Sequence, residues 1–381
     1  MQSNSNHPPV HVPHRGALPT TLFTRHDQSQ RSPNEASPYY GAALRHCDQA
    51  HDDYAGYPDL QSALVSQAID DLSFVDEVTQ AADRIKDVVI RSPLFLFEGM
   101  PVKDETQQLT RAYKLRGALN FINSFAELAR EAGVVTASAG NHGQAVALAA
   151  SKLGVRAMVV VPEYTPRVKR DGIVSHGGEV IVYGNSYAAA AGYALQLTEN
   201  RKGLYVPAYD HRTIMAGQAT VGEEVLQQVP NVTDVLVATG GGGLLAGLAK
   251  YYGVRAPNVQ LWGCGVEGAS AVATALVSGN TGRTVTNRFA DGIAVEKLGD
   301  VTWPEIQRNV AGALTSPETE LRATVGRLSL AGHEVEGAGA AGIAAAQLHS
   351  RRLGARPVAI ATGGNIDPDV LAACRALAVA A

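Results

Sequence analysis

Two cations, Lys114 and Arg116, lie in the segment TRAYKLRGALN, residues 110–120, where a polar run gives way to the helix predicted from the apolar period of LNFINSFAELA, residues 119–129. Positive charges at a helix N-terminus oppose the helix dipole, so this placement is mildly unfavourable unless something uses the charges. A lysine that is withdrawn from water can form an imine with an aldehyde. Lys114 is therefore a candidate for covalent chemistry, and a solvated helix start is the alternative.

Four consecutive glycines follow an apolar run and open a helical pattern in ATGGGGLLAG, residues 238–247. Such glycines leave the backbone free to aim N–H groups at one point, and the helix start adds partial positive charge. The turn predicts a phosphate cradle that consists of Gly240, Gly241, Gly242, Gly243 and Leu244. The same stretch also fits the dinucleotide pattern G-x-G-x-x-A, with Glu267 after the next apolar run, so a nicotinamide-dinucleotide-binding protein is an alternative.

Two further turns after apolar runs have compositions that suit a ligand. In SAGNHGQ, residues 138–144, small residues permit close approach, and Asn141 offers both donors and an acceptor. Exposed N–H groups at this helix start could hold a carboxylate. In ATGGNID, residues 361–367, the Thr362 hydroxyl could bond to a ring nitrogen. Helix capping and ordinary turn formation are the alternative interpretations of both turns.

Together these features indicate one ligand that carries a phosphate for the glycine turn, an aldehyde for Lys114, a phenolic oxygen for Asn141 and a ring nitrogen for Thr362. Pyridoxal 5'-phosphate has all four groups. A nicotinamide dinucleotide has no use for the lysine and leaves the second and third turns unexplained. We therefore expect pyridoxal 5'-phosphate as the cofactor.

The elements that must position these turns are short apolar runs that alternate with helical segments from about residue 134 onward. Strands are predicted at 133–138, 156–162, 178–184, 203–209, 234–240, 259–267 and 357–364, and helices at 144–154, 165–177, 186–200, 213–229, 244–253 and 338–352. Thr165 is expected to cap its helix, with Pro166 in the first turn. Because the strands are nearly all apolar, both faces of the sheet are buried, and the β-α-β order predicts a doubly wound parallel α/β protein.

Composition limits the class of protein. The 381 residues are 45% hydrophobic with a net charge of -4, so two domains and no nucleic-acid partner are expected. The sequence has no run of 18 apolar residues, no signal peptide and only three distant cysteines, which predicts a cytoplasmic protein without a membrane span, disulfide or zinc site. Residues 1–58 are polar and lack either apolar period, which predicts a mobile extension.

The residues of these motifs and their order along the chain resemble those of the threonine dehydratase and serine racemase group of fold-type II pyridoxal phosphate enzymes. VKDETQQLTRAYKLRGALN resembles the cofactor-lysine segment of that group, SAGNHGQAVA its substrate-carboxylate loop and GGGGLLAG its phosphate loop. Six further motifs occur in the same order as in the group: VPEYTPRVKR, AGQAT, GVEG, FADGIAV, EGAGAAG and ATGGNID. The resemblance implies two doubly wound parallel-sheet domains with the cofactor in the cleft between them. The large domain would be 59–132 plus 212–381, and the small inserted domain 133–211.

The resemblance also implies roles for individual residues. Lys114 would hold the cofactor as an imine and remove the α-proton of the substrate, which would lie against Ser138, Ala139, Gly140, Asn141 and His142. Arg116 is expected to be structural, or to lie near the phosphate. The implied reaction is β-elimination of a β-hydroxy amino acid such as L-threonine or L-serine to a 2-oxo acid and ammonia, in a homodimer or higher homo-oligomer. An amino-acid racemase and a β-replacement synthase are the alternatives on the same scaffold.

The chain departs from this group at several positions. Arg111 and Ala112 stand where the group usually has small, hydroxyl-containing residues. The racemase branch has a proton-donating serine at the position of Ala139. It also has a second metal ligand at the position of Ala273, in addition to the one that corresponds to Glu267. Racemisation and a bound metal ion are therefore not expected.

Overall fold

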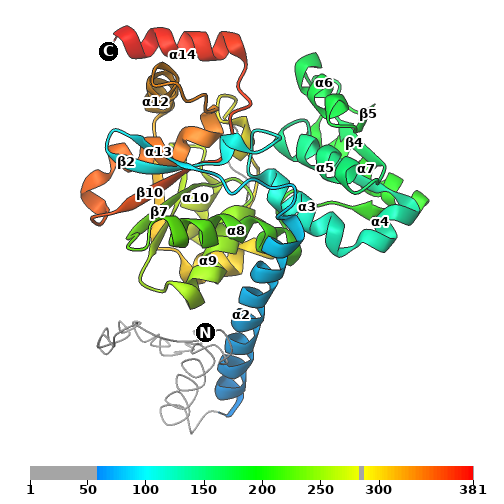
Figure 1. Ribbon diagram of the computed structural model, residues 1–381, viewed down its shortest axis with the longest axis horizontal. Helices are drawn as coiled ribbons and strands as arrows, with labels where there is room; N and C mark the ends of the chain where they lie inside the picture. The colour runs from blue at the N-terminus through cyan, green and yellow to red at the C-terminus, as the bar shows by residue number, and fades with distance from the viewer. Residues whose placement is uncertain (1–57, 283–286, 381) are drawn as a thin grey trace, which may run out of the picture. The chain divides into compact units, whose positions relative to one another are not determined.

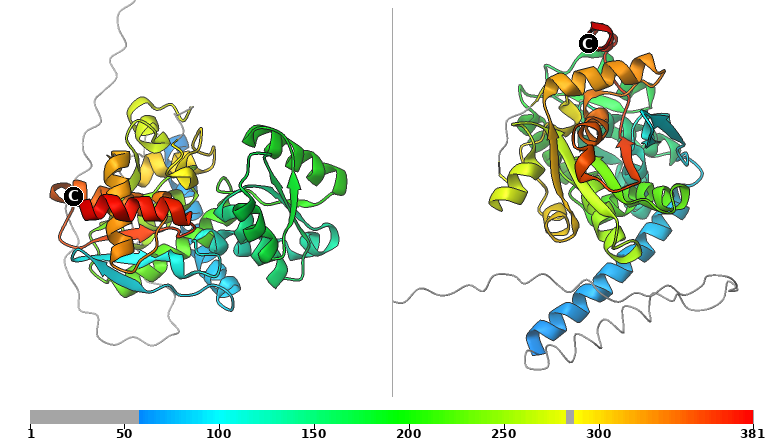
Figure 2. Two further views of the ribbon diagram at one scale, coloured as in Figure 1. Left: turned by 90° about the horizontal axis from the view of Figure 1, so that it is seen from above. Right: turned by 90° about the vertical axis from the view of Figure 1, so that its left-hand side faces the viewer.

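The computed structural model describes residues 58–282 and 287–380, which form two sheets with helices on both faces (Figures 1 and 2). The predicted mobile extension lies outside the described residues except for Pro58, where helix α2 (Pro58–Ile85) begins. Within the described ranges, we find no helix with the length and apolar character that a membrane span requires.

The larger sheet has the strand order β1-β2-β10-β7-β8-β9. Its strands are β1 (Leu94–Phe97), β2 (Met100–Asp104), β7 (Asp234–Ala238), β8 (Gln260–Val266), β9 (Gly312–Ser316) and β10 (Pro357–Ala361). Neighbouring strands are parallel except for the β1–β2 hairpin, which the sequence analysis missed. Glu98 and Gly99 form its two-residue turn with φ of 49° and 81°, and a non-glycine residue at the first of these positions weakens the turn signal.

Successive residues of β7 face opposite helix layers, because side chains alternate along a strand. Val235 belongs to a core with α8 (Arg212–Gln228), α9 (Gly243–Arg255) and α10 (Ala271–Ser278). Leu236 belongs to a second core with α12 (Glu318–Leu330), α13 (Gly337–Leu348) and α14 (Pro368–Ala380), and Figure 1 shows α14 next to α12. Burial on both faces explains why these strands are almost uniformly apolar.

The smaller sheet has the order β5-β4-β3-β6 and is entirely parallel. Its strands are β3 (Val134–Ala137), β4 (Ala157–Val161), β5 (Glu179–Val182) and β6 (Leu204–Tyr205). Helix α7 (Tyr187–Arg201) packs on one face, and α5 (Asn141–Lys152) and α6 (Arg167–Ser175) pack on the other. All of this sheet falls within residues 133–211, and the domain boundaries themselves stay a prediction.

Three local predictions are wrong. Helix α6 begins after Pro166, and the buried hydroxyl of Thr165 caps nothing and has no hydrogen-bond partner among the described residues. Pro166 has a φ of -57° and a ψ of 146°, so it is not helical and takes the cap position itself, one residue after Thr165. The helix expected to continue through residues 119–129 breaks at Phe125, between α3 (Lys114–Ser124) and α4 (Ala126–Ala132). The strand expected at 203–209 is limited to β6.

Candidate functional site

Lys114 is the first residue of α3, and its Nζ donates a hydrogen bond of 2.7 Å to the carbonyl oxygen of Ala208. Burial lowers the pKa of Lys114 from 10.5 to about 8. A fraction of this side chain is therefore the neutral amine near pH 7, and the neutral amine is the form that attacks a carbonyl group or accepts a proton.

Arg116 lies in a buried ion cluster instead of facing a ligand. Its side chain is 1% exposed and makes two 2.8 Å hydrogen bonds to Glu105, as well as bonds of 2.7 and 3.0 Å to Glu224. Lys103 Nζ contacts Glu224 at 2.5 Å, so two cations face two anions. Burial opposes the charge of Arg116, but the two carboxylates raise its pKa above the usual value. The cluster anchors α3 to α8 and confirms the structural role expected for Arg116.

The glycine turn lies between β7 and α9, as predicted. Gly242 has a φ of 96°, in the left-handed region, and α9 begins at Gly243. A Cβ atom on Gly241 would lie 2.5 Å from the ring of Tyr209, and one on Gly242 would lie 2.7 Å from Ile306 Cδ1. The turn therefore accepts no larger residue. The first N–H groups of α9 have no acceptor within the helix, so they are available to an anion.

Asn141 is the first residue of α5, and its amide is held from two sides. Its Nδ2 donates to Glu336 Oε1 at 2.6 Å, and its Oδ1 accepts from Asn365 Nδ2 at 2.8 Å. Asn141 thereby joins the first turn of α5 to the start of α13 and to the turn after β10.

The other residues of the SAGNHGQ turn differ in what they offer a ligand. The Ser138 hydroxyl accepts a 3.2 Å hydrogen bond from the Gly140 N–H, which fixes the shape of the turn. Ala139 is partly buried against the core of the smaller sheet. His142 Nε2 lies 3.1 Å from the Val206 carbonyl oxygen, and burial lowers the pKa of His142 to about 3. The His142 side chain is therefore a neutral core group, and only its backbone N–H lies at the helix start.

Thr362 follows β10 and is 5% exposed. Its carbonyl oxygen accepts a 3.1 Å hydrogen bond from the Tyr113 N–H, and Ala112 forms a β-bridge with Gly363. The Thr362 turn is thus paired directly with the residues that precede Lys114.

Contacts between neighbouring residues bring the predicted turns together. The ring of Tyr209 packs on Gly241, and residue 208 accepts the hydrogen bond of Lys114. The backbone beside Lys114 pairs with the Thr362 turn. Asn365, three residues beyond Thr362, contacts Asn141. The three turns selected from the sequence and the helix start at Lys114 therefore form one continuous cluster.

Glu336 is a polar residue of this cluster that the sequence analysis did not select. Its N–H donates to the Gly363 carbonyl oxygen at 3.0 Å, so its carboxyl group lies beside both Asn141 and the Thr362 turn. Burial raises the pKa of Glu336 to about 7, with Asp291 adding to the rise, while the Asn141 hydrogen bond opposes it, as do the charges of Lys169 and Arg111. The sequence signal that could have identified Glu336 is a single acidic residue directly before the glycine- and alanine-rich segment that forms α13.

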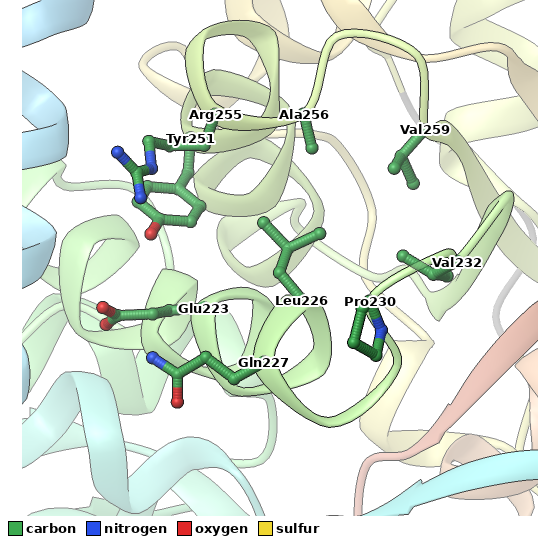
Figure 3. A pocket seen from close by; sticks show the side chains of 9 residues that line it. All are labelled: Glu223, Leu226, Gln227, Pro230, Val232, Tyr251, Arg255, Ala256 and Val259. Carbon is green, nitrogen blue, oxygen red and sulfur yellow. The ribbon is translucent and has the colours of Figure 1, made fainter. Parts of the chain in front are cut away.

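Two other features lie outside this cluster. A pocket of about 350 Å³ between α8 and α9 (Figure 3) is lined by Glu223, Leu226, Gln227, Pro230, Val232, Tyr251, Arg255, Ala256 and Val259, none of which is a predicted site residue. The carboxylates of Asp70, Asp71 and Glu305 gather near one another, but Lys250 Nζ already lies among them at 2.6, 2.6 and 2.9 Å.

Residues 87–363 match a protein family described as pyridoxal-phosphate dependent enzyme. The chain is 40% identical to the L-threonine ammonia-lyase of Geobacter sulfurreducens over 303 residues, which are 76% of this chain and 75% of the relative. It spans about half the length of another curated relative, threonine dehydratase 2 of Solanum lycopersicum.

Two solved structures share the fold. The processed form of threonine deaminase isoform 2 from Solanum lycopersicum has a TM-score of 0.77 at 32% identity and covers 82% of this chain and 89% of its own. Maize serine racemase has a TM-score of 0.74 at 29% identity and covers 78% and 95%. The predicted α/β fold class and the predicted cofactor are confirmed. The chain belongs to the pyridoxal-phosphate dependent enzymes, in the fold-type II group.

Proposed function

We propose that this enzyme is an ammonia-lyase that converts L-threonine or L-serine to a 2-oxo acid and ammonia. The observation that carries the proposal is Lys114, a lysine of lowered pKa in one cluster with a glycine turn suited to phosphate and a helix start suited to carboxylate. The Geobacter relative, an L-threonine ammonia-lyase at 40% identity, supports this reaction and substrate class.

The residues of the cluster fit pyridoxal phosphate. Because the glycine turn has no room for side chains, only backbone N–H groups of Gly240–Leu244 would face the phosphate. Asn141 would donate to the phenolic oxygen, and the Thr362 hydroxyl would bond to the ring nitrogen, leaving the ring largely neutral. When bound, the cofactor supplies the electron sink for loss of the α-proton.

Lys114 would hold the cofactor and act as the general base. Its lowered pKa keeps part of the side chain as a neutral amine at physiological pH, so Nζ can accept the α-proton of the substrate. The substrate carboxylate would bind to the free N–H groups in the first turn of α5, at Asn141 and His142. These contacts would orient the amino acid in the same cluster as Lys114.

Ala139 favours elimination over racemisation. Racemisation requires a second proton donor on the opposite face of the cofactor, and the alanine side chain has no exchangeable proton. The nearby Ser138 hydroxyl already accepts a hydrogen bond from the Gly140 N–H. We therefore expect ammonia release with little or no D-amino acid.

The proposal is tested by replacing Lys114 with alanine. The variant should lose both the borohydride-sensitive visible band of the cofactor and the release of 2-oxo acid from L-threonine and L-serine. Lys152→Ala, which changes an exposed lysine at the end of α5, is the matched control and should retain both. Normal turnover by Lys114→Ala would refute the assignment.

The same proposal includes the organisation of the protein. Residues 133–211 would form a small domain that closes over the substrate, next to a large domain of 59–132 plus 212–381. The enzyme would assemble as a homodimer or higher homo-oligomer in the cytoplasm. Light scattering and cell fractionation test the last two points.

A further inference from the structure

We infer that Glu336 and Asn365 are positioning residues, which fix the Asn141 amide in one orientation and leave a single N–H to bind the phenolic oxygen of the cofactor. The inference rests on the proposed role of Asn141. Two hydrogen bonds between this amide and the side chains of Glu336 and Asn365 carry it, together with a third from Asn365 to a backbone carbonyl oxygen.

The Asn365 amide can point in only one direction. Its Nδ2 donates to the Thr110 carbonyl oxygen at 2.9 Å and to Asn141 Oδ1 at 2.8 Å. A backbone carbonyl oxygen only accepts hydrogen bonds, so reversing the Asn365 amide would place two oxygens against each other. Both N–H groups of Asn365 are therefore used, and the Asn141 atom that faces it must be the acceptor.

Glu336 specifies the same orientation independently. Its Oε1 lies 2.6 Å from Asn141 Nδ2, and the residue is only 8% exposed. The backbone of Glu336 is itself held by the hydrogen bond to Gly363. When Glu336 is ionised, a reversed Asn141 amide would bring its oxygen against a buried carboxylate oxygen, which costs the desolvation of both acceptors.

The hydrogen-bonding capacity of Asn141 then leaves one donor. Asn365 occupies Oδ1 and Glu336 occupies one of the two N–H groups on Nδ2, so one N–H of fixed direction remains. A donor that is already oriented needs no rearrangement when a ligand binds. Because Asn365 also bonds to Thr110, four residues before Lys114, this donor and the lysine belong to one network.

The test follows the visible absorption band of the bound cofactor in the full-length holoenzyme. Asn365→Leu and Glu336→Leu should each move the pH at which the band changes upward by about one unit, roughly a tenfold change. The direction follows because weaker donation to the phenolic oxygen leaves the conjugated nitrogen more basic. Glu336→Gln keeps an acceptor oxygen for Asn141 and should retain the wild-type titration.

A double-mutant cycle separates positioning from general structural damage. In an Asn141→Ala background, Asn365→Leu and Glu336→Leu should shift the titration no further. An equal shift in that background would overturn the inference, as would an unchanged titration in both folded single variants. If either leucine variant does not fold, the alanine variant of the same residue, Asn365→Ala or Glu336→Ala, replaces it in the cycle.

A control variant and a distinct readout separate failure of this inference from failure of the proposed function. Asn287→Leu removes an amide that donates to a different carboxylate, Glu318 at 2.7 Å, and should leave the titration unchanged. Failure of the proposed function would instead appear as a wild-type cofactor band that Lys114→Ala leaves unaltered.

Discussion

Replacing Lys114 with methionine should stabilise the cofactor-free protein near neutral pH. Burial lowers the pKa of Lys114 from 10.5 to about 8, so folding at pH 7 places a charged group where water is scarce. Between about pH 8 and 10.5 the unfolded chain binds more protons at this residue than the folded chain does. The stability of the wild type relative to the methionine variant must therefore rise with pH across this interval.

The size of the effect follows from the same values. A pKa that falls from 10.5 to about 8 corresponds to about 3 kcal/mol of stability lost below pH 8, at about 1.4 kcal/mol per unit. Methionine carries no charge but leaves the Ala208 carbonyl without its 2.7 Å hydrogen bond, which costs about 1 kcal/mol. The variant should be more stable than the wild type by about 2 kcal/mol at pH 7, and less stable by about 1 kcal/mol above pH 10.5.

Urea unfolding of both cofactor-free proteins, followed by circular dichroism from pH 7 to pH 10.5, measures this difference. Lys86→Met is the control, because the Lys86 side chain is 65% exposed and its replacement should change stability equally at every pH. A difference between wild type and Lys114→Met that does not vary with pH would refute the reasoning, since it would mean that folding does not desolvate this lysine.

Three other substitutions test the glycine turn, the buried ion cluster of Arg116 and the SAGNHGQ turn. Gly242→Ala should weaken pyridoxal phosphate binding at least about tenfold, because its φ is 96° and the new Cβ would lie 2.7 Å from a neighbouring side chain; wild-type affinity in equilibrium dialysis would contradict this. Arg116→Met should lower the free energy of unfolding by about 3–5 kcal/mol, because Glu105 and Glu224 lose their buried partner; a loss below about 1 kcal/mol in urea would count against it. Ala139→Ser should introduce formation of D-serine from L-serine without abolishing ammonia release, and abundant D-serine from the wild type in chiral chromatography would overturn the elimination mechanism.

Local composition was enough to select the turns that cluster in the candidate site. Four glycines at 240–243 and the hydroxyl of Thr362 follow β7 and β10 of the larger sheet, where the carboxyl ends of parallel strands lie at one edge, and the small residues around Asn141 follow β3 of the smaller sheet. The fold class was predictable for a similar reason, because strands buried on both faces must be apolar throughout.

What the sequence did not reveal is the set of long-range polar contacts. Arg116 appeared as one of two cations at a helix start, and nothing near it in the chain pointed to Glu224 as its partner, 108 residues away. Glu336 and Asn365 were missed because their importance lies in what they contact, 195 and 224 residues from Asn141. Side-chain pairing at such separations leaves no periodic or compositional signal in a single sequence.

The pairing of β2 with β10 determines when the enzyme can complete its structure during synthesis. Residues 100–104 need residues 357–361 as their neighbour in the larger sheet, whereas the smaller sheet uses strands from residues 134–205 alone. At a translation rate of about 5–20 residues per second, the smaller sheet can form on the ribosome roughly 10–30 s before β10 is made. Throughout that delay the edge of β2 that later pairs with β10 has unpaired backbone N–H and C=O groups, so it is open to pairing with strands of other chains.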